Sequence, residues 1–216
     1  MQHTKNFLNR RVLGMKYNII YADPPWFYSA RNNKSKFGHG ANQYKLMTNK
    51  DIIALDIGAL SADNCACFLW VTMPNLQVGL DCLKSWGFVY KTVAFAWIKT
   101  NKNNKNPFFG VGYYTKSNAE LCLLGVKGKM KPISNRVSSA IITPIREHSK
   151  KPDEARNGIS ELFGKLPSIE LFTRPPFDVT ELCNESETPS NWTFTGLECD
   201  GKDIKDFIKE SSSCPI

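Results

Sequence analysis

The amino-acid sequence predicts an α/β sandwich built around a mostly parallel sheet. Short apolar runs alternate along most of the chain with segments in which apolar residues recur at helical spacing. Most of these runs are apolar throughout, which is typical of strands that are buried on both faces. Strands and helices that alternate in this way form a sheet with helices on both sides.

Seven runs are predicted to be strands. Tyr17–Ala22 is the clearest, because it is apolar and ends close to two consecutive prolines, which the interior of a strand does not tolerate. The segments 28–46 and 99–107 are polar and basic, so we expect loops there. In chain order, the predicted strands are 17–22, 66–72, 90–98, 119–125, 139–143, 168–173 and 191–195.

Four segments are predicted to be helices. Leu76, Leu80 and Leu83 fall on one face of the second of them. Thr48 is expected to cap the first helix and Ser149 the third, because a hydroxyl oxygen in that position can accept a backbone N–H. In chain order, the predicted helices are 48–55, 75–86, 150–163 and 202–210.

The length of the chain predicts a single domain over residues 1–216, with about 1–15 and 203–216 peripheral or flexible. Apolar residues make up 42% and charged residues 22%, as in soluble globular proteins. No run of about 18 apolar residues occurs, and the first residues are polar and basic, so the sequence predicts neither a membrane span nor a secretion signal. We therefore expect a cytoplasmic protein.

The cysteines and histidines argue against metal and disulfide chemistry. The 7 cysteines include no CxxC pair, and most lie in apolar runs, which indicates reduced thiols that pack in the core. Only 3 histidines occur. The sequence therefore predicts no metal site.

The net charge of +8 is unevenly distributed. Residues 175–216 carry 3 basic and 9 acidic residues, a net charge of −6, so the first 174 residues carry 25 and 11, a net charge of +14. A basic body indicates a polyanionic partner, with nucleic acid first. The alternative is that the charge serves solubility alone.

The tetrapeptide Asp23-Pro24-Pro25-Trp26 directly follows the first strand. An exocyclic amine on a base is weakly nucleophilic, because its lone pair is delocalised into the ring. Two acceptors aimed at the amino hydrogens favour a localised lone pair, since their hydrogen bonds strengthen as charge develops on nitrogen. Asp23 offers a carboxylate, Pro24 a backbone carbonyl, and the prolines restrict φ. Trp26 offers a face on which an extruded base can stack, or is simply a core residue.

The chain resembles the N6-adenine methyltransferases with a DPPW motif, which include the catalytic subunit of the eukaryotic mRNA adenosine methyltransferase and many phage and bacterial proteins. The resemblance covers about residues 17–201 and is strongest toward the bacterial and phage members. It implies a Rossmann-like methyltransferase with a permuted motif order, in which the catalytic tetrapeptide precedes the main cofactor strand. The matching blocks are 21–26, 44–47, 68–72, 97–101, 120–125, 146–154, 169–172 with Arg174, and 191–192 with Gly196.

The resemblance also implies a cofactor, S-adenosylmethionine, and a role for each matching residue. Asp23, Pro24, Pro25 and Trp26 match the catalytic residues that hold the target adenine. Lys151 matches a lysine at the cofactor's carboxylate, although a surface lysine is the alternative. The other residues that match cofactor contacts are Asp23, Glu170, Phe172, Arg174, Leu197 and Glu198, of which Glu170 could instead pair with a structural lysine.

Some positions depart from the family pattern. Thr173 replaces a glycine, and Leu197-Glu198 replace an Asn-Gln pair. None of the departures falls in the tetrapeptide. Side chains expected to contact nucleic acid lie in the two basic loops, where a solvated surface is the alternative. They are Tyr28, Arg31, Lys34, Lys36, Lys99, Lys102 and Lys105.

Together these observations predict an enzyme that methylates the N6 amino group of adenine in nucleic acid, with DNA favoured over RNA. Methylation of RNA, methylation of cytosine N4 and a non-catalytic nucleic-acid-binding subunit are the alternatives. No segment is long enough for a separate base-reading domain. We therefore expect relaxed sequence specificity, or a homodimer or accessory subunit that supplies it.

Overall fold

The computed structural model describes residues 14–27, 47–112, 114–146, 150–173, 191–197, 199 and 201–213. Every predicted strand and helix has a counterpart in this part of the chain. The predicted loop 28–46 lies outside the described residues.

Seven strands form one sheet in the order β5-β3-β4-β2-β1-β6-β7. All of them run in the same direction except β4, which is antiparallel to both of its neighbours. This confirms the predicted mostly parallel sheet. The strands are β1 (Tyr17–Ala22), β2 (Ser61–Thr72), β3 (Val89–Thr100), β4 (Ala119–Lys127), β5 (Ala140–Pro144), β6 (Ser168–Leu171) and β7 (Trp192–Thr195).

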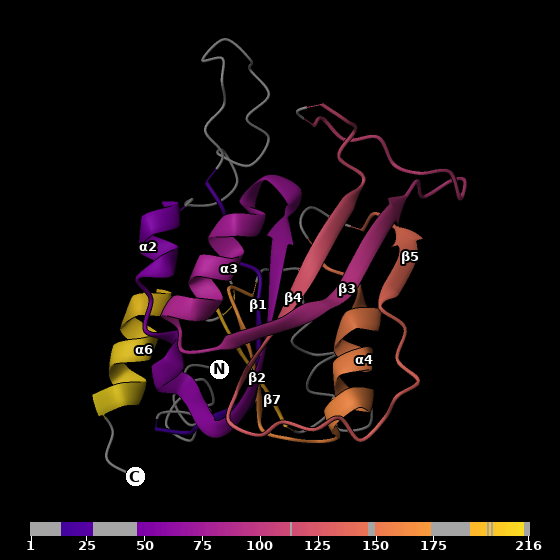
Figure 1. Cartoon of the computed structure of the whole chain (residues 1–216). Coiled ribbons are helices and arrows are strands. Elements are labelled where there is room, and N and C mark those ends of the chain that lie inside the picture. Colours follow the sequence, from indigo (N-terminus) through magenta and orange to yellow (C-terminus); the bar gives the residue numbers. More distant parts are fainter. Residues whose placement is uncertain are drawn as a thin grey trace, which may run out of the picture.

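Helices cover both faces of the sheet, which confirms the predicted sandwich (Figure 1). One core cluster joins the sheet to α2 (Asn49–Ile53), the 3₁₀ turn η1 (Ile57–Leu60), α3 (Leu76–Ser85) and α6 (Ile204–Ser213). A second cluster joins the other face to α4 (Asp153–Phe163). A further 3₁₀ turn, η2 (Met73–Asn75), leads from β2 into α3.

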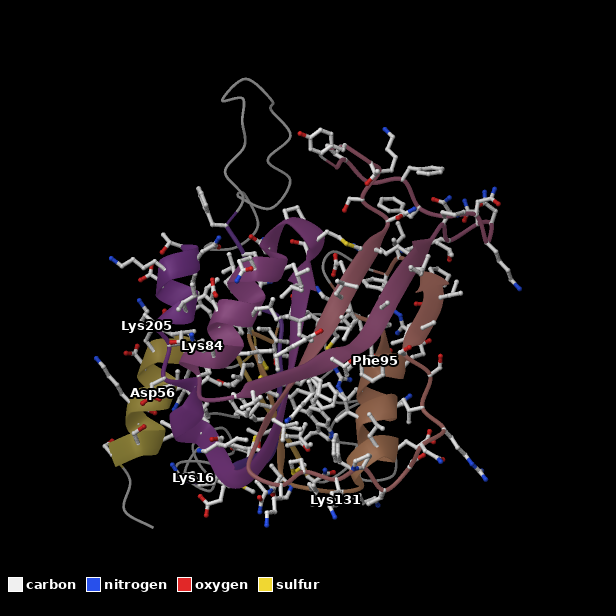
Figure 2. The ribbon with its side chains drawn as sticks, viewed as in Figure 1. Lys16, Asp56, Lys84, Phe95, Lys131 and Lys205 are labelled. Atoms are coloured by element: carbon white, nitrogen blue, oxygen red, sulfur yellow. The ribbon has the colours of Figure 1, made fainter. Side chains whose placement is uncertain are left out.

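Side chains of the two core clusters are buried, and many charged side chains lie on the surface. Figure 2 shows Phe95 turned into the molecule, and only 1% of its surface is exposed. The labelled lysines Lys16, Lys131 and Lys205 lie on the outside in the same view. No helix in the part of the chain that the structure describes is both long and apolar enough to cross a membrane.

The start of the third predicted helix differs from the sequence prediction for an identifiable reason. The third helix begins at Asp153 with Pro152 at its N-cap, so the prediction that Ser149 caps it is wrong. Proline favours this boundary, because it has no N–H to leave unpaired and its ring fixes φ. The first helix is capped by Thr48 as predicted, because the Thr48 hydroxyl accepts the Asp51 N–H at 3.1 Å.

The segment predicted to be peripheral or flexible at the C-terminal end contains a helix that packs into the core. Ile204, Phe207 and Ile208 on α6 are buried against α2 and η1. Their spacing of three and four residues places them on one helical face, and burying that face stabilises the helix. This finding corrects the expectation for residues 204–213.

The cysteines contribute to packing. Among the described residues, Cys65, Cys67, Cys82 and Cys122 are buried free thiols. Burial raises the pKa of Cys65 to about 12 and that of Cys82 to about 12. Neutral thiols of this kind behave as small apolar side chains, so they do not supply a nucleophile at neutral pH.

The central strand β1 determines where the site lies. Its neighbours are β2, which follows it in the chain, and β6, which comes much later. The chain therefore moves to opposite sides of β1, and ligands of open α/β sheets bind at such a reversal, beyond the carboxyl ends of the strands. Asp23 is the first residue beyond that end of β1.

Candidate active site

Backbone and side-chain hydrogen bonds hold the tetrapeptide on both sides. The Trp26 N–H donates to the Pro24 carbonyl at 2.8 Å, and the Met47 N–H donates to the Pro25 carbonyl at 3.1 Å. The Trp26 indole N–H donates to the Trp70 carbonyl on β2 at 3.1 Å. A carbonyl oxygen has two lone pairs, so Pro24 can accept a second donor in addition to Trp26.

The Trp26 ring is a core residue in this structure. It is 4% exposed and belongs to the core cluster on the face covered by α2 and α3. Its indole fixes the turn against β2, which keeps Asp23 and Pro24 in place. Stacking of a base on Trp26 therefore stays a prediction.

Asp23 belongs to a cluster of four charged side chains that come from four different elements. The Lys151 ammonium donates to Asp23 Oδ2 at 2.7 Å and lies 3.2 Å from Glu120 Oε2. Glu120 also pairs with Lys99, at the end of β3. Carboxylates and ammonium groups thus alternate in the order Asp23, Lys151, Glu120 and Lys99, from the end of β1 to the start of β4 and the end of β3.

Aromatic rings flank the two cations of this cluster. Lys151 Nζ lies 5.8 Å from the centre of the Trp70 ring, and Lys99 Nζ lies 5.1 Å from that of Trp97. Such cation–π contacts stabilise a partly desolvated ammonium. The rings and ion pairs restrict the lysine side chains, which are otherwise among the most mobile in proteins.

The two lysines keep Glu120 ionised. Burial by itself raises the pKa of Glu120, but Lys151 and Lys99 outweigh it, so that pKa lies below its ordinary value. An ionised Glu120 attracts Lys151 and holds it beside Asp23.

Glu170 has a different partner. Its Oε2 accepts from Arg156 Nε at 3.1 Å and from Nη2 at 2.8 Å. The Arg156 guanidinium lies 6.0 Å from the Trp192 ring and 5.6 Å from the Phe194 ring. Glu170 thus forms a structural ion pair, as the alternative expected, but its partner is an arginine and not a lysine. The ribose contact of Glu170 stays a prediction.

A cleft of about 500 Å³ opens at the carboxyl ends of β1, β6 and β7. That volume is within the range of about 300–1,000 Å³ typical of small-molecule and cofactor sites. Two predicted cofactor residues, Phe172 and Leu197, line it together with Pro25 of the tetrapeptide. The remaining wall comes mainly from α2 and α6, and the lining residues there are Asp51, Ile204, Lys205, Asp206 and Lys209.

The backbone at the floor of this cleft is tightly packed. Phe172 has a positive φ of 63°, which is uncommon for a residue other than glycine and ends β6 with a sharp turn. A Cβ at Gly196 would lie 2.5 Å from the Thr173 carbonyl oxygen, so only glycine fits there. The close approach of these two loops shapes the end of the cleft beside β7.

The other predicted site residues are spread over the molecule. Lys99 is part of the charged cluster, whereas Lys102 and Lys105 are exposed on the loop after β3. Among the described residues, no group of three or more His, Cys, Asp and Glu is placed to hold a metal ion. Six predicted site residues lie outside the described residues, namely Tyr28, Arg31, Lys34, Lys36, Arg174 and Glu198.

Two charged residues of these networks were not singled out from the sequence. Glu120 is the second residue of β4 and precedes an apolar run, and Arg156 is a half-buried residue of the amphipathic helix α4. A charged residue in an apolar run is rarely buried without a partner, and this signal could have identified Glu120. Nothing in the sequence indicated that Glu120 pairs with Lys99 and Lys151, because these residues lie in distant parts of the chain.

Comparison with known proteins agrees with this geometry. The sequence pattern of the MT-A70 family matches residues 17–183. The type II methyltransferase M.MunI of a Mycoplasma species is 35% identical over 179 residues, which are 75% of this chain and 74% of that protein.

Eukaryotic proteins are similar over a longer stretch of this chain. The MT-A70-like N(6)-adenosine-methyltransferase of Drosophila melanogaster is 32% identical over 197 residues, 90% of this chain and 29% of that protein. The human N(6)-adenosine-methyltransferase catalytic subunit METTL3 is 30% identical over 202 residues, 93% of this chain and 31% of that protein. This chain thus spans about a third of these longer relatives.

The family pattern begins at the first residue of β1 and continues past β6, so it includes the tetrapeptide, Glu120, Lys151 and the strand beside the cleft. Methyltransferases of this family have a Rossmann-like fold, and the sheet described above agrees with it. The chain therefore belongs to the MT-A70 family and is an N6-adenine methyltransferase.

Proposed function

We propose that this enzyme transfers the methyl group of S-adenosylmethionine to the N6 amino group of adenine in DNA. The observation that carries the proposal is the position of Asp23 and Pro24 at the end of the central strand, beside Lys151. Pro25 of the same tetrapeptide lines the cleft, so the acceptors for the base and the wall of the cofactor site are consecutive residues.

The Asp23 carboxylate and the Pro24 carbonyl are the two acceptors for the amino hydrogens of the target base. Their hydrogen bonds strengthen as the nitrogen attacks the methyl group and acquires positive charge. Glu120 and Lys151 keep the Asp23 carboxylate in one orientation through the ion pairs described above. The proton that the methylated nitrogen then loses can pass to water.

The residues of the cleft fit S-adenosylmethionine, which supplies an electrophilic methyl group when bound. Phe172, Leu197 and Pro25 offer apolar surface for a purine ring. By resemblance, we assign Lys151 to the carboxylate of the methionine part. By resemblance, we assign Glu170 and Arg174 to the ribose of the cofactor. Leu197 and Glu198 are assigned to its adenine ring in the same way.

DNA is the favoured substrate because the similarity to M.MunI extends over most of both proteins. RNA is the second candidate, because proteins named as adenosine methyltransferases match up to 93% of this chain. A cytoplasmic location, and a homodimer or accessory subunit that supplies sequence specificity, complete the proposal. The free thiols of the described cysteines support that location.

The test is a nucleoside assay by mass spectrometry. The purified protein and its Asp23→Asn variant are incubated with labelled S-adenosylmethionine and, separately, single-stranded DNA, duplex DNA and RNA. We expect labelled N6-methyldeoxyadenosine with the wild type only. Label in RNA alone would show that the substrate is RNA and not DNA. Label on cytosine would show that adenine is not the target base. Full activity of the variant would refute the role of Asp23.

A non-catalytic nucleic-acid-binding subunit gives a distinct outcome in the same assay. Such a protein would transfer no label to any substrate. Calorimetry with S-adenosylmethionine then separates two cases. Binding of the cofactor without transfer would point to a missing partner or substrate, whereas no binding would overturn the enzymatic proposal.

A further inference from the structure

We propose that the segment between β3 and β4, of which the structure describes residues 101–112 and 114–118, is a nucleic-acid-binding arm. Its exposed aromatic side chains stack on bases next to the target adenine. This inference rests on the proposed function, because it deepens the description of the same substrate. Figure 1 shows the segment projecting beyond the ends of β3 and β4.

The arm has a defined backbone. The Phe108 N–H donates to the Lys99 carbonyl at 2.8 Å, and Gly110 and Ser117 exchange two backbone hydrogen bonds of 3.2 and 3.1 Å. A Cβ at Gly112 would lie 2.0 Å from the Thr115 carbonyl oxygen, so the tight turn needs glycine there. A turn of this kind presents its side chains outward instead of collapsing onto the sheet.

The tip carries large apolar side chains that contact almost nothing. Tyr114 is 99% exposed, Val111 is 92% exposed and Phe109 is 66% exposed. Single exposed apolar residues are common on protein surfaces. Three of them within six residues, on a projecting turn, instead indicate a surface that a partner covers.

The charge of the arm indicates the kind of partner. Lys102, Lys105 and Lys116 are exposed, and the sequence of residues 101–118 contains no acidic residue. Proteins that bind single-stranded nucleic acid combine lysines along the backbone with aromatic side chains on which bases stack. The combination of aromatic residues and lysines without acidic residues therefore favours nucleic acid over a protein partner.

The root of the arm is part of the catalytic cluster. Lys99 precedes the arm and Glu120 follows it, and Glu120 lies beside Lys151, which pairs with Asp23. A strand of eight residues spans at most about 27 Å, so the tip lies less than one duplex turn of about 34 Å from its root. The arm can thus reach bases on either side of an adenine held at Asp23.

Removing the base from its stack explains why aromatic side chains would be useful there. A flipped adenine leaves neighbouring bases with an unstacked face, and unstacking costs a few kcal/mol. Phe109 and Tyr114 can cover such a face, while the lysines bind the flanking phosphates. The arm would then contribute to opening the substrate in addition to binding it.

The experiment measures binding of the full-length protein to a fluorescein-labelled single-stranded DNA oligonucleotide of mixed sequence, by anisotropy at several salt concentrations. Two sets of variants separate the two kinds of contact. Phe109→Ala/Tyr114→Ala removes the stacking surface, and Lys102→Gln/Lys105→Gln/Lys116→Gln removes the charge. Tyr90→Ala is the matched control, because Tyr90 is an exposed aromatic residue at the opposite end of β3.

We expect the aromatic variant to bind about tenfold more weakly with an unchanged salt dependence. The lysine variant should reduce the slope of log K against log salt by about 2, since each phosphate contact on a single strand contributes about 0.7. The control should bind like the wild type. Wild-type binding by both sets of variants would overturn the proposal.

Two further measurements, of oligomeric state and of methylation, distinguish this proposal from its alternatives. If the aromatic variant binds DNA normally but changes the oligomeric state in sedimentation, the arm is a protein interface and the proposal is wrong. If the wild type methylates DNA and the arm variants are equally active at low substrate concentration, only the arm proposal fails. Absence of methylation by the wild type would count against the proposed function, and the binding data would still decide the role of the arm.

Discussion

The two buried ion-pair groups on this sheet are about equally exposed, yet they differ in how many cations they contain. The side chains of Glu120 and Glu170 are 13% and 11% exposed. Burial outweighs the single Arg156 and raises the pKa of Glu170, whereas two lysines outweigh burial and lower the pKa of Glu120. The number of cations therefore decides how firmly each carboxylate keeps its charge.

This difference distinguishes a structural ion pair from the cluster that we propose to be catalytic. Glu170 and Arg156 join β6 to α4, with Trp192 and Phe194 beside the guanidinium. The cluster of Asp23, Lys99, Glu120 and Lys151 lies instead at the end of β3, the start of β4 and the loop after β1, where we expect the substrate to bind. We expect substitutions in the first group to affect stability and substitutions in the second to affect catalysis.

The largest effect is expected for Arg156→Met. The substitution leaves the Glu170 carboxylate buried without its cation, which typically costs about 3–5 kcal/mol. Urea unfolding should show a loss of that size in the free energy of unfolding. The double variant Arg156→Met/Glu170→Gln should recover part of it, and a loss below about 1 kcal/mol would show that the pair is not structural.

Lys151→Met is expected to show the opposite pattern. Asp23 loses the cation that orients it, so kcat should fall about a hundredfold or more, as when a single preorganised polar contact is removed from an active site. The free energy of unfolding should fall by less than for Arg156→Met, because Glu120 keeps Lys99 as a partner. A loss of stability as large as that of Arg156→Met would remove the distinction between the groups.

Glu120→Gln should have a smaller effect on catalysis. Glutamine keeps the size of the side chain but no longer attracts Lys151 as a charge, so we expect kcat to fall about tenfold. Binding of S-adenosylmethionine, measured by calorimetry, should change less than kcat. An unchanged kcat would show that Lys151 needs only Asp23 to stay in place.

The smallest effect is a pH dependence of stability. Because the folded pKa of Glu120 is below its unfolded value of about 4.3, its ion pairs stabilise the fold above that pH. This contribution is lost as pH falls through the folded pKa. The difference in unfolding free energy between the wild type and Glu120→Gln should be constant near neutral pH and shrink below about pH 4. A difference that grows on acidification would have the wrong sign.

Some features of the site follow from local sequence patterns. The strand Tyr17–Ala22 was predicted with its observed bounds, because its apolar run and the prolines after it leave one interpretation. The same prolines place Asp23 at the strand end. Thr48 was recognised as a cap for a similar reason, since a cap depends on residues three positions apart.

Other features depend on contacts between distant residues. The start of α4 was predicted three residues too early. Serine is a common N-cap residue, and the sequence alone does not show whether the residues after it are helical. The segment with α6 looked peripheral, because the apolar surface that its buried face meets comes from α2 and η1, some 150 residues earlier in the chain.

The sequence by itself determined the fold class, the central strand and the tetrapeptide at its end, because periodicity and proline act over a few residues. Only the tertiary structure decided which charged side chains pair with each other. Lys151 pairs with Asp23, which is 128 residues away in the sequence, and Glu170 pairs with Arg156. The physical reason is that the energy of an ion pair depends on the distance between its charges in space. The order of the strands sets those distances, and local sequence patterns do not predict that order.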